Sequence, residues 1–263
     1  MSAARGGRPE LPALERLALA VAAQCMTVPR HVAFIMDGNR RFAKQRGQRG
    51  SQGHIFGYTT LLRVLEWCMK LGVTEVTVYA FSIDNFKRSE EEVATLMNLA
   101  KEKFAEFLKH TELVMQNEIR VNVLGDLSLL PSDLREAAEH VMKRTRQHKR
   151  LIFNICFAYT SSEEIARTVR EIVRDARAGK LDKESISRDL ISSRMYTRGS
   201  NPQLVIRTSG ETRLSDFLVW QAAYAHLHFI NVTWPELNVW HILWAFWDYH
   251  VYGNRARISL SQS

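Results

Sequence analysis

Six short apolar runs alternate with longer amphipathic stretches along the chain, and this alternation limits the fold more than any other feature. Residues 57–70 carry apolar side chains at helical spacing and end before Gly72, while Ser161 and Glu164 predict a capping box at the start of another helix. Repeated strand-helix units are typical of a mostly parallel sheet covered by helices. The predicted strands are His31–Met36, Glu75–Phe81, Ile119–Leu124, Leu151–Phe157, Gln203–Arg207 and Leu227–Val232.

The predicted fold class is α/β, a single domain with a mostly parallel central sheet of about six strands flanked by helices. No low-complexity linker or internal repeat divides the 263 residues. We expect a disordered N-terminus over residues 1–9, an amphipathic helix over 10–27, the main domain over 28–252 and a C-terminal tail over 253–263.

A polar cluster follows the first predicted strand, with the sequence Asp37-Gly38-Asn39-Arg40-Arg41. Ligands of parallel sheets bind at the carboxyl ends of the strands. Glycine lets backbone N–H groups approach phosphate oxygens, and the start of a helix attracts anions. Asp37 offers hard oxygen atoms that suit Mg²⁺. Taken alone, the cluster fits a solvated turn equally well.

Two further polar clusters follow other predicted strands. Residues 82–88 combine a hydroxyl, a carboxylate, an amide and two cations, and residues 207–215 place Arg207 and Arg213 on either side of hydroxyls and a glycine. The forked donors of arginine match phosphate geometry. Each cluster alone reads as a polar loop, but three at one sheet edge predict a phosphate-binding site.

The formal net charge is +8, which indicates an anionic partner. Nucleic acid, a membrane surface and phosphorylated substrates all remain open on charge alone, as does a merely solvated basic surface. Nucleic-acid binding predicts exposed aromatics interleaved with Lys and Arg on a sheet face, whereas this sheet reads as buried on both sides, so we expect no nucleic acid partner.

Several stretches resemble, in order, the cis-prenyltransferase family, the undecaprenyl and dehydrodolichyl diphosphate synthases. They are HVAFIMDGNRRFAK (31–44), GH (53–54), VYAFSIDNFKRS (78–89), NICFAY (154–159), VIRTSGETRLSDFLVWQ (205–221) and TWPEL (233–237). The similarity runs from about residue 28 to 250, and the twin Arg40-Arg41 resembles the eukaryotic dehydrodolichyl diphosphate synthase catalytic subunits.

The resemblance implies a Mg²⁺-dependent enzyme with a hydrophobic tunnel. It would condense isopentenyl diphosphate with an allylic diphosphate, primed by farnesyl diphosphate, to give a long-chain polyprenyl diphosphate, with the dolichol precursor favoured. Asp37 would hold the metal. The residues implied in catalysis are Asp37, Asn85, Arg88, His54 and Ser82. Those implied in substrate binding are Gly38, Asn39, Arg40, Arg41, Phe81, Phe86, Arg207, Arg213 and Ser215, with the two phenylalanines at the tunnel mouth.

Two of the departures from the homodimeric bacterial pattern bear on how the enzyme is assembled. Tyr224-Ala225 is followed by His226 in place of a glutamate, and residues 252–257 lack the family's Arg-x-Gly motif. The second departure resembles catalytic subunits that work with a non-catalytic relative of the Nogo-B-receptor/Nus1 type. A heteromer is therefore expected, with a homodimer as the alternative. A catalytically silent partner subunit is the competing function, but such relatives tend to lose the aspartate and phosphate arginines retained here.

Two apolar segments bear on location. The N-terminal helix could pack on the body or lie on a membrane, and its run Leu17–Ala23 is too short to span a bilayer. Trp240, Trp244 and Trp247 near the C-terminus favour a core or subunit interface over a membrane-interface belt. The resemblance implies peripheral contact with the cytosolic face of the endoplasmic reticulum membrane, and otherwise a cytoplasmic protein.

Overall fold

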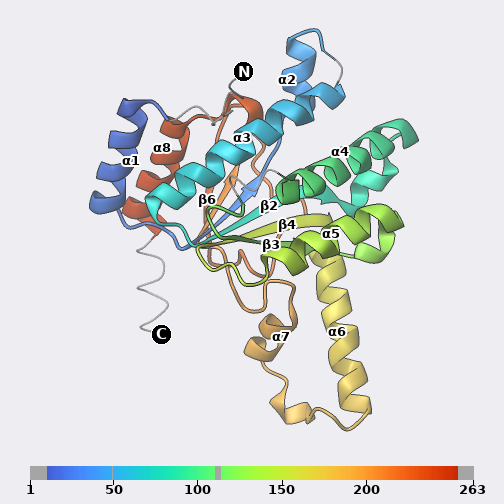
Figure 1. Cartoon of the computed structure of the whole chain (residues 1–263). Helices are drawn as coiled ribbons and strands as arrows, with labels where there is room; N and C mark the ends of the chain where they lie inside the picture. The colour runs from blue at the N-terminus through green and yellow to red at the C-terminus, as the bar shows by residue number, and fades with distance from the viewer. Residues whose placement is uncertain (1–10, 49, 110–113, 254–263) are drawn as a thin grey trace.

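Six parallel strands form one sheet in the computed structural model, which describes residues 11–48, 50–109 and 114–253. The strand order is β3-β4-β2-β1-β5-β6 (Figure 1). Each strand overlaps its predicted run, so the predicted fold class is confirmed. The strands are β1 His31–Ile35, β2 Glu75–Ser82, β3 Ile119–Leu124, β4 Leu151–Tyr159, β5 Leu204–Arg207 and β6 His226–Phe229. The predicted disordered terminus and most of the predicted tail lie outside the described residues.

Helices connect the strands and cover the sheet unequally (Figure 1). The helices α1, α3, α4, α5 and α8 lie on one side of it, whereas α6 and α7 project on the other side as an arm. Within the described residues, no helix combines the length and apolar character needed to cross a bilayer. The helices are α1 Ala13–Cys25, α2 Asn39–Gln45, α3 Gly50–Leu71, α4 Glu90–Lys109, α5 Ser132–Thr145, α6 Ser161–Arg177, α7 Arg188–Arg194 and α8 Val239–Asp248.

Two hydrophobic clusters bury the two faces of the sheet. Since side chains alternate along a strand, Val32 and Phe34 enter the larger cluster with residues of the covering helices. Ala33 enters the smaller cluster, where Phe217 and Leu218 of the segment after β5 cover the sheet. Burial on both faces is characteristic of parallel sheets and explains why the strand runs are almost uniformly apolar.

The start of α6 differs from the predicted capping box. Thr160, one residue earlier, is the N-cap, and its hydroxyl accepts a hydrogen bond from the backbone N–H of Glu163. Glu164 is fully buried, and its carboxylate accepts hydrogen bonds from the Tyr159 hydroxyl at 2.6 Å and the Gln221 amide at 3.0 Å. The predicted capping box of Ser161 and Glu164 was wrong, because the Glu164 carboxylate binds side chains elsewhere in the fold instead of the backbone at the start of the helix.

A buried imidazole at the opposite edge of the sheet from the carboxyl ends gives the fold a pH dependence. His31 lies 2.7 Å from the Thr77 hydroxyl through Nε2. Burial lowers its pKa from 6.5 to about 4, and the nearby Glu75 carboxylate opposes this shift only in part. The unfolded chain therefore binds the proton more readily between these two pH values.

The stability contributed by neutral His31 should be complete above pH 6.5 and fall as the pH drops towards 4. The expected loss is about 2 kcal/mol at pH 5 and about 3 kcal/mol at pH 4. Urea unfolding of the wild type and of His31→Gln across this range measures it, because the variant should show a shallower decline. Equal slopes for both proteins would contradict the assignment.

Candidate active site

A cavity of about 800 Å³ opens at the carboxyl edge of the sheet. The ends of β1, β2 and β5 and the start of α2 supply its polar lining, and α3 and α4 lie over it. Most residues that the sequence predicts for the site are brought together here. They are Asp37, Gly38, Asn39, Arg40, Arg41, His54, Phe81, Ser82, Asn85, Arg88, Arg207 and Ser215.

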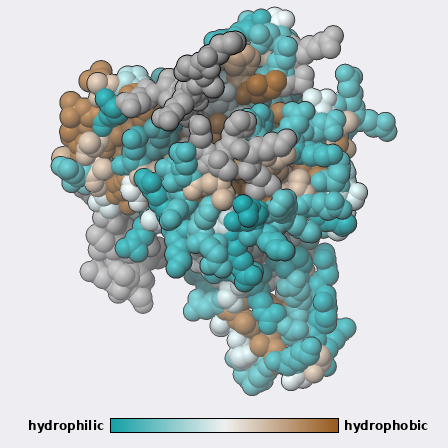
Figure 2. Space-filling view, in the orientation of Figure 1, coloured by the Kyte–Doolittle hydropathy of each residue, from teal (hydrophilic) through white to brown (hydrophobic). Residues whose placement is uncertain are grey.

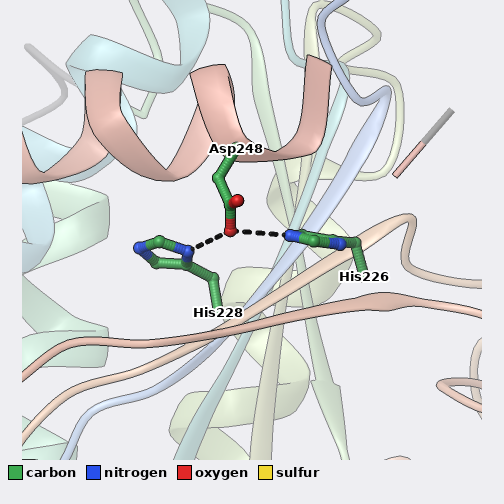
Figure 3. A group of neighbouring side chains, drawn as sticks. All are labelled: His226, His228 and Asp248. Carbon is green, nitrogen blue, oxygen red and sulfur yellow. Dashed lines mark hydrogen bonds and ion pairs between the residues drawn. The ribbon is translucent and has the colours of Figure 1, made fainter. Parts of the chain in front are cut away.

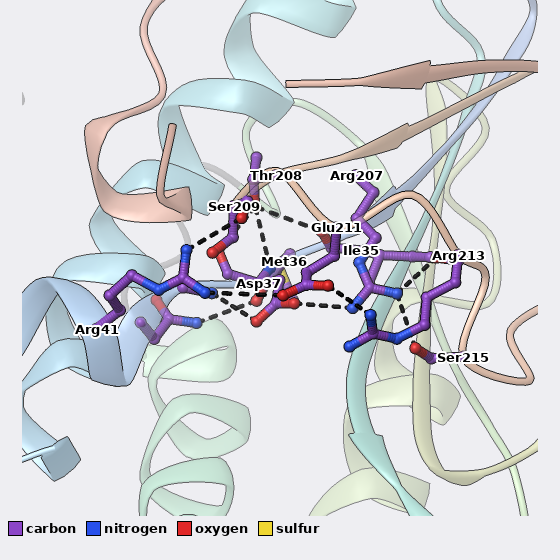
Figure 4. Close-up of polar contacts among 12 residues, drawn as sticks. Ile35, Met36, Asp37, Arg41, Arg207, Thr208, Ser209, Glu211, Arg213 and Ser215 are labelled. Atoms are coloured by element: carbon purple, nitrogen blue, oxygen red, sulfur yellow. Dashed lines mark hydrogen bonds and ion pairs between the residues drawn. The ribbon is translucent and has the colours of Figure 1, made fainter. Parts of the chain in front are cut away.

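Asp37 and Arg207 form an ion pair at the junction of β1 and β5 (Figure 4). The parallel register sets Arg207 beside Ile35, two residues before Asp37. Arg207 Nη2 donates to Asp37 Oδ2 at 2.8 Å, and the arginine side chain is only 5% exposed against 39% for the aspartate. The structure thus fixes a buried cation beside a carboxylate that still faces the cavity.

The segment after β5 holds the other donors of Arg207. Its Nη1 donates to the Ser215 hydroxyl at 2.7 Å and to the carbonyl oxygen of Arg213 (Figure 4). Ser209 and Ser215 in this segment both have positive φ values, of 79° and 51°. Such backbone conformations cost energy in residues other than glycine and concentrate at functional sites. The segment is therefore shaped around the guanidinium group.

Gly38 makes the turn from β1 into α2 with a φ of 98°. A Cβ atom at this position would lie 2.8 Å from the Cβ of Thr233, so only glycine fits. Its N–H donates to Asp37 Oδ1 at 2.7 Å. Arg41, one turn along, donates to the Ser209 carbonyl at 3.1 Å and keeps an exposed side chain (Figure 4).

His54 on α3 is a largely buried imidazole beside the cavity. Burial first, and then the positive charges of Arg88 and Arg40, lower its pKa from 6.5 to about 4, against a rise from Glu92. The imidazole is therefore neutral at pH 7. Its Nε2 atom is buried and has no partner among the described residues. A neutral imidazole with a free nitrogen can exchange a proton with a ligand.

Unpartnered buried polar atoms gather around this cavity. The described residues contain eight such side-chain atoms, and four of them belong to residues that line the cavity. These four are Asn39 Oδ1, His54 Nε2, Arg207 Nε and Ser209 Oγ. Because native structures pair nearly all buried polar groups, this concentration indicates a site that a polar ligand completes.

The turn after β2 is held by a reciprocal pair of hydrogen bonds. Ser82 Oγ accepts from the N–H of Asp84, and Asn85 Oδ1 accepts from the N–H of Ser82 at 3.1 Å. Arg88 ends this turn, with its Nη1 2.7 Å from Glu92 Oε1. The same carboxylate lies 3.4 Å from Arg40, so Glu92 holds two cations that face the cavity. The sequence pattern alone does not predict this role of Glu92, because it depends on the tertiary contact between α2 and the start of α4.

Apolar side chains of α4 and the sheet line the remainder of the cavity. The Phe81 ring stacks on Phe157 with centroids 5.2 Å apart. The other apolar lining residues include Leu96, Leu99, Ala100, Phe104, Phe107 and Ile155. The site therefore combines a cationic, metal-compatible part with a hydrophobic part large enough for a hydrocarbon chain.

Two predicted site residues lie outside this lining. Arg213 is 64% exposed and pairs with Glu211 rather than turning into the cavity. Phe86 packs edge-on against Phe81 at 5.0 Å but lines a smaller cavity of about 400 Å³ beside α4 and α5. The structure therefore does not bring these two side chains into the cavity lining, and their roles in substrate binding stay predictions, although the backbone carbonyl of Arg213 holds Arg207.

A family model described as putative undecaprenyl diphosphate synthase matches residues 35–257. The chain belongs to the cis-prenyltransferase family and is an enzyme of cis-prenyl chain elongation. Members of this family are generally Mg²⁺-dependent. Asp37 fits that requirement here, since one cavity-facing carboxylate completed by water and substrate phosphates is a common Mg²⁺ arrangement.

Three relatives and one solved structure show how similar this chain is to known proteins. A human dehydrodolichyl diphosphate synthase complex subunit is 45% identical over 225 residues, which are 85% of this chain. The chain spans about two thirds of the length of this subunit and its mouse counterpart, 68% and 65%. A geranylgeranyl-diphosphate-specific tritrans,polycis-undecaprenyl-diphosphate synthase of Thermococcus kodakarensis is 48% identical over 80% of each chain. Lavandulyl diphosphate synthase from Lavandula x intermedia, solved with dimethylallyl diphosphate, superimposes with a TM-score of 0.81 at 31% identity, covering 85% of this chain and 95% of that one.

Proposed function

We propose that this chain condenses isopentenyl diphosphate with a growing allylic diphosphate, starting from farnesyl diphosphate, to make the polyprenyl diphosphate precursor of dolichol. The observation that carries the proposal is that the same cavity has arginines and Asp37 in one part and a hydrophobic lining in the other. A diphosphate head and a prenyl tail need these two environments together. The lavender relative supports it, since that protein was solved with an allylic diphosphate.

Asp37 would hold Mg²⁺ against the diphosphates. Bound there, the ion would neutralise charge on the leaving diphosphate. The α2 N-terminus at Gly38 and Asn39, with Arg40, Arg41 and Arg88, would bind the allylic diphosphate.

On the β5 side, Arg207 and Ser215 would bind isopentenyl diphosphate, and Arg213 would join them if its exposed side chain turns inward. The C–O bond that breaks is that of the allylic diphosphate, and fixed cations around that diphosphate would lower the barrier to its cleavage.

The polar groups beside the β2 turn would assist the loss of the proton and the departure of the diphosphate. Neutral His54 has an unused nitrogen atom, and the amide of Asn85 and the hydroxyl of Ser82 lie on the same cavity wall. The terminal carbon of the isopentenyl double bond bonds to the allylic carbon as the allylic C–O bond breaks and diphosphate leaves. The resulting cation then loses a proton from the carbon between the methyl-bearing centre and the carbon that carries the diphosphate, which forms the new double bond. Holding both substrates in register contributes much of the acceleration.

A second subunit would complete the enzyme. The absent Arg-x-Gly motif motivates a Nogo-B-receptor/Nus1-type partner, with a homodimer as the alternative. The α6–α7 arm offers a surface for it, because Val169 and Val173 are 48% and 42% exposed on α6 and hydrophobic side chains are visible in the arm (Figure 2). The human relative is itself named as a complex subunit.

Incorporation of radiolabelled isopentenyl diphosphate into extractable lipid tests the function. Purified chain with farnesyl diphosphate and Mg²⁺ is assayed with and without a Nus1-type partner. We expect activity that depends on the partner. Full activity without the partner would support the proposed enzymatic activity but contradict the proposed heteromer. No incorporation under any condition would favour a catalytically silent subunit.

The proposed location is the cytosolic face of the endoplasmic reticulum membrane, reached by peripheral contact. Helices α1 and α8 lie side by side and leave large apolar side chains uncovered, and α1 forms a hydrophobic area in Figure 2. Leu17 is 62% exposed and Trp244 is 65% exposed. An apolar face with tryptophans is suited to the headgroup region of a bilayer.

Removing one of these side chains should weaken vesicle binding. Leu17→Gln and Trp244→Gln are each expected to lower the vesicle-bound fraction by about tenfold, because each burial is worth about 1.5–3 kcal/mol. Sedimentation with phosphatidylcholine–phosphatidylserine vesicles measures this. Leu129→Gln is the matched control, since Leu129 is 45% exposed outside both helices. Equal binding by all variants would exclude this face.

A further inference from the structure

Two histidines and one aspartate form a cluster that the prenyl chemistry does not use (Figure 3). His226 Nε2 lies 2.8 Å from Asp248 Oδ2, and His228 Nδ1 lies 2.6 Å from the same oxygen atom. Their ligand atoms all lie within 4.8 Å of one another, and they are the only such group within the part of the chain that the structure describes.

The fold presents the three side chains to one point. His226 and His228 are two residues apart on β6, so they project from the same face of this edge strand. Asp248 is the last residue of α8, which lies over that face. The cluster therefore joins the edge of the sheet to the end of a helix.

The donor set matches a divalent transition ion. We propose that His226, His228 and Asp248 bind one Zn²⁺-class ion, with a fourth position open to water. Two imidazole nitrogens and a carboxylate oxygen suit zinc and its neighbours, whereas Mg²⁺ prefers oxygen ligands alone. The side chains are only 19%, 11% and 26% exposed, so they form a sheltered site that water can still reach.

The donor atoms lie near the separations that an ion requires, with each nitrogen within 2.8 Å of the carboxylate oxygen and all three atoms within 4.8 Å of one another. Tetrahedral coordination with bonds of about 2.0–2.1 Å separates donor atoms by about 3.3 Å, so each imidazole has to withdraw by about half an ångström. Binding replaces the two N–H···O hydrogen bonds by metal bonds. Each imidazole stays neutral, because the proton leaves the ligating nitrogen and the other ring nitrogen carries one instead. Side chains that are already gathered need little further ordering.

This site is chemically separate from the one at Asp37. His226 lies at the first residue of β6, whereas Asp37 follows the carboxyl end of β1 in a parallel sheet, so the two lie at opposite ends of their strands. The ion would act as a clamp between β6 and α8. We expect it to raise the melting temperature without substituting for Mg²⁺ in the cavity.

Titration of the chelator-treated full chain with Co²⁺ and Zn²⁺ under saturating Mg²⁺ tests the proposal. One equivalent of Co²⁺ should give the visible absorption of a tetrahedral site, and Zn²⁺ should displace it and raise the melting temperature. His228→Ala and Asp248→Asn should each lower the affinity by about 100-fold or more, beyond the 10–100-fold typical for residues that only support a ligand.

Asp248→Asn keeps the proposal testable if His228→Ala does not fold, because the asparagine amide oxygen can still accept both hydrogen bonds. His140→Ala, which removes an exposed histidine of α5, should bind metal like the wild type. Absence of stoichiometric binding, or equal affinity in Asp248→Asn and wild type, would mean a hydrogen-bonded cluster only and overturn the proposal.

Discussion

Asp37→Ala should reduce incorporation of isopentenyl diphosphate by about 10³-fold or more, the largest loss we expect from any single change. The substitution removes the carboxylate that would hold Mg²⁺ and leaves Arg207 buried without its 2.8 Å anionic partner. Both losses act on the charge of the diphosphates. Steady-state assays with saturating farnesyl diphosphate and varied Mg²⁺ measure the effect.

Asp37→Asn separates the two losses, because its amide oxygen can still accept from Arg207 whereas a neutral amide binds Mg²⁺ poorly. We expect it to be nearly as impaired as Asp37→Ala while melting close to the wild type. Asp133→Ala is the control, since Asp133 pairs with Lys101 outside the main cavity. An active Asp37→Asn enzyme would rule out the metal role of Asp37.

The sequence predicts the sheet well because most of its strands are buried on both faces. Runs such as residues 31–36 and 151–157 are then mostly apolar, with His31 and Asn154 as buried polar exceptions. Only the boundaries differ, as β4 continues to Tyr159 and α3 begins at Gly50. The order β3-β4-β2-β1-β5-β6 depends on which helices pack together, which periodicity does not encode.

The polar part of the site is predictable from topology, because the carboxyl ends of parallel strands share one edge. The directions of individual side chains are not. Arg213 was expected in the site and turns to Glu211, and Phe86 was expected at the tunnel mouth and packs behind Phe81. The local motif determines where the backbone lies, whereas the direction of a long or aromatic side chain depends on the residues that pack against it in the fold.

The hydrophobic part of the site shows the same limit. The spacing of Leu96, Ala100 and Phe104 predicts an amphipathic helix, and α4 is one. A helix that lines a cavity and a helix that fills a core carry the same pattern, since both present an apolar stripe to the protein interior. Only the structure shows that this stripe borders an open volume rather than the sheet alone.

Arg207→Lys should lower kcat/KM for isopentenyl diphosphate by about 10²–10³-fold, the second large effect we expect. The guanidinium group reaches Asp37, Ser215 and the carbonyl of Arg213 at once from a nearly buried position. A lysine keeps the charge but offers one nitrogen atom in place of the fork, so it cannot hold all three acceptors. The strained segment at Ser215 would then lose its anchor.

A role at the isopentenyl diphosphate site predicts a rise in KM for that substrate with little change in KM for farnesyl diphosphate. Arg150→Lys is the matched control, because Arg150 contacts Asn117 away from the cavity. If Arg207 acts through Asp37, Arg207→Lys should cost much less in the Asp37→Asn background than in the wild type. Equal rises in both KM values would instead assign Arg207 a purely structural function, whereas additive losses in the double variant would show that it acts independently of Asp37.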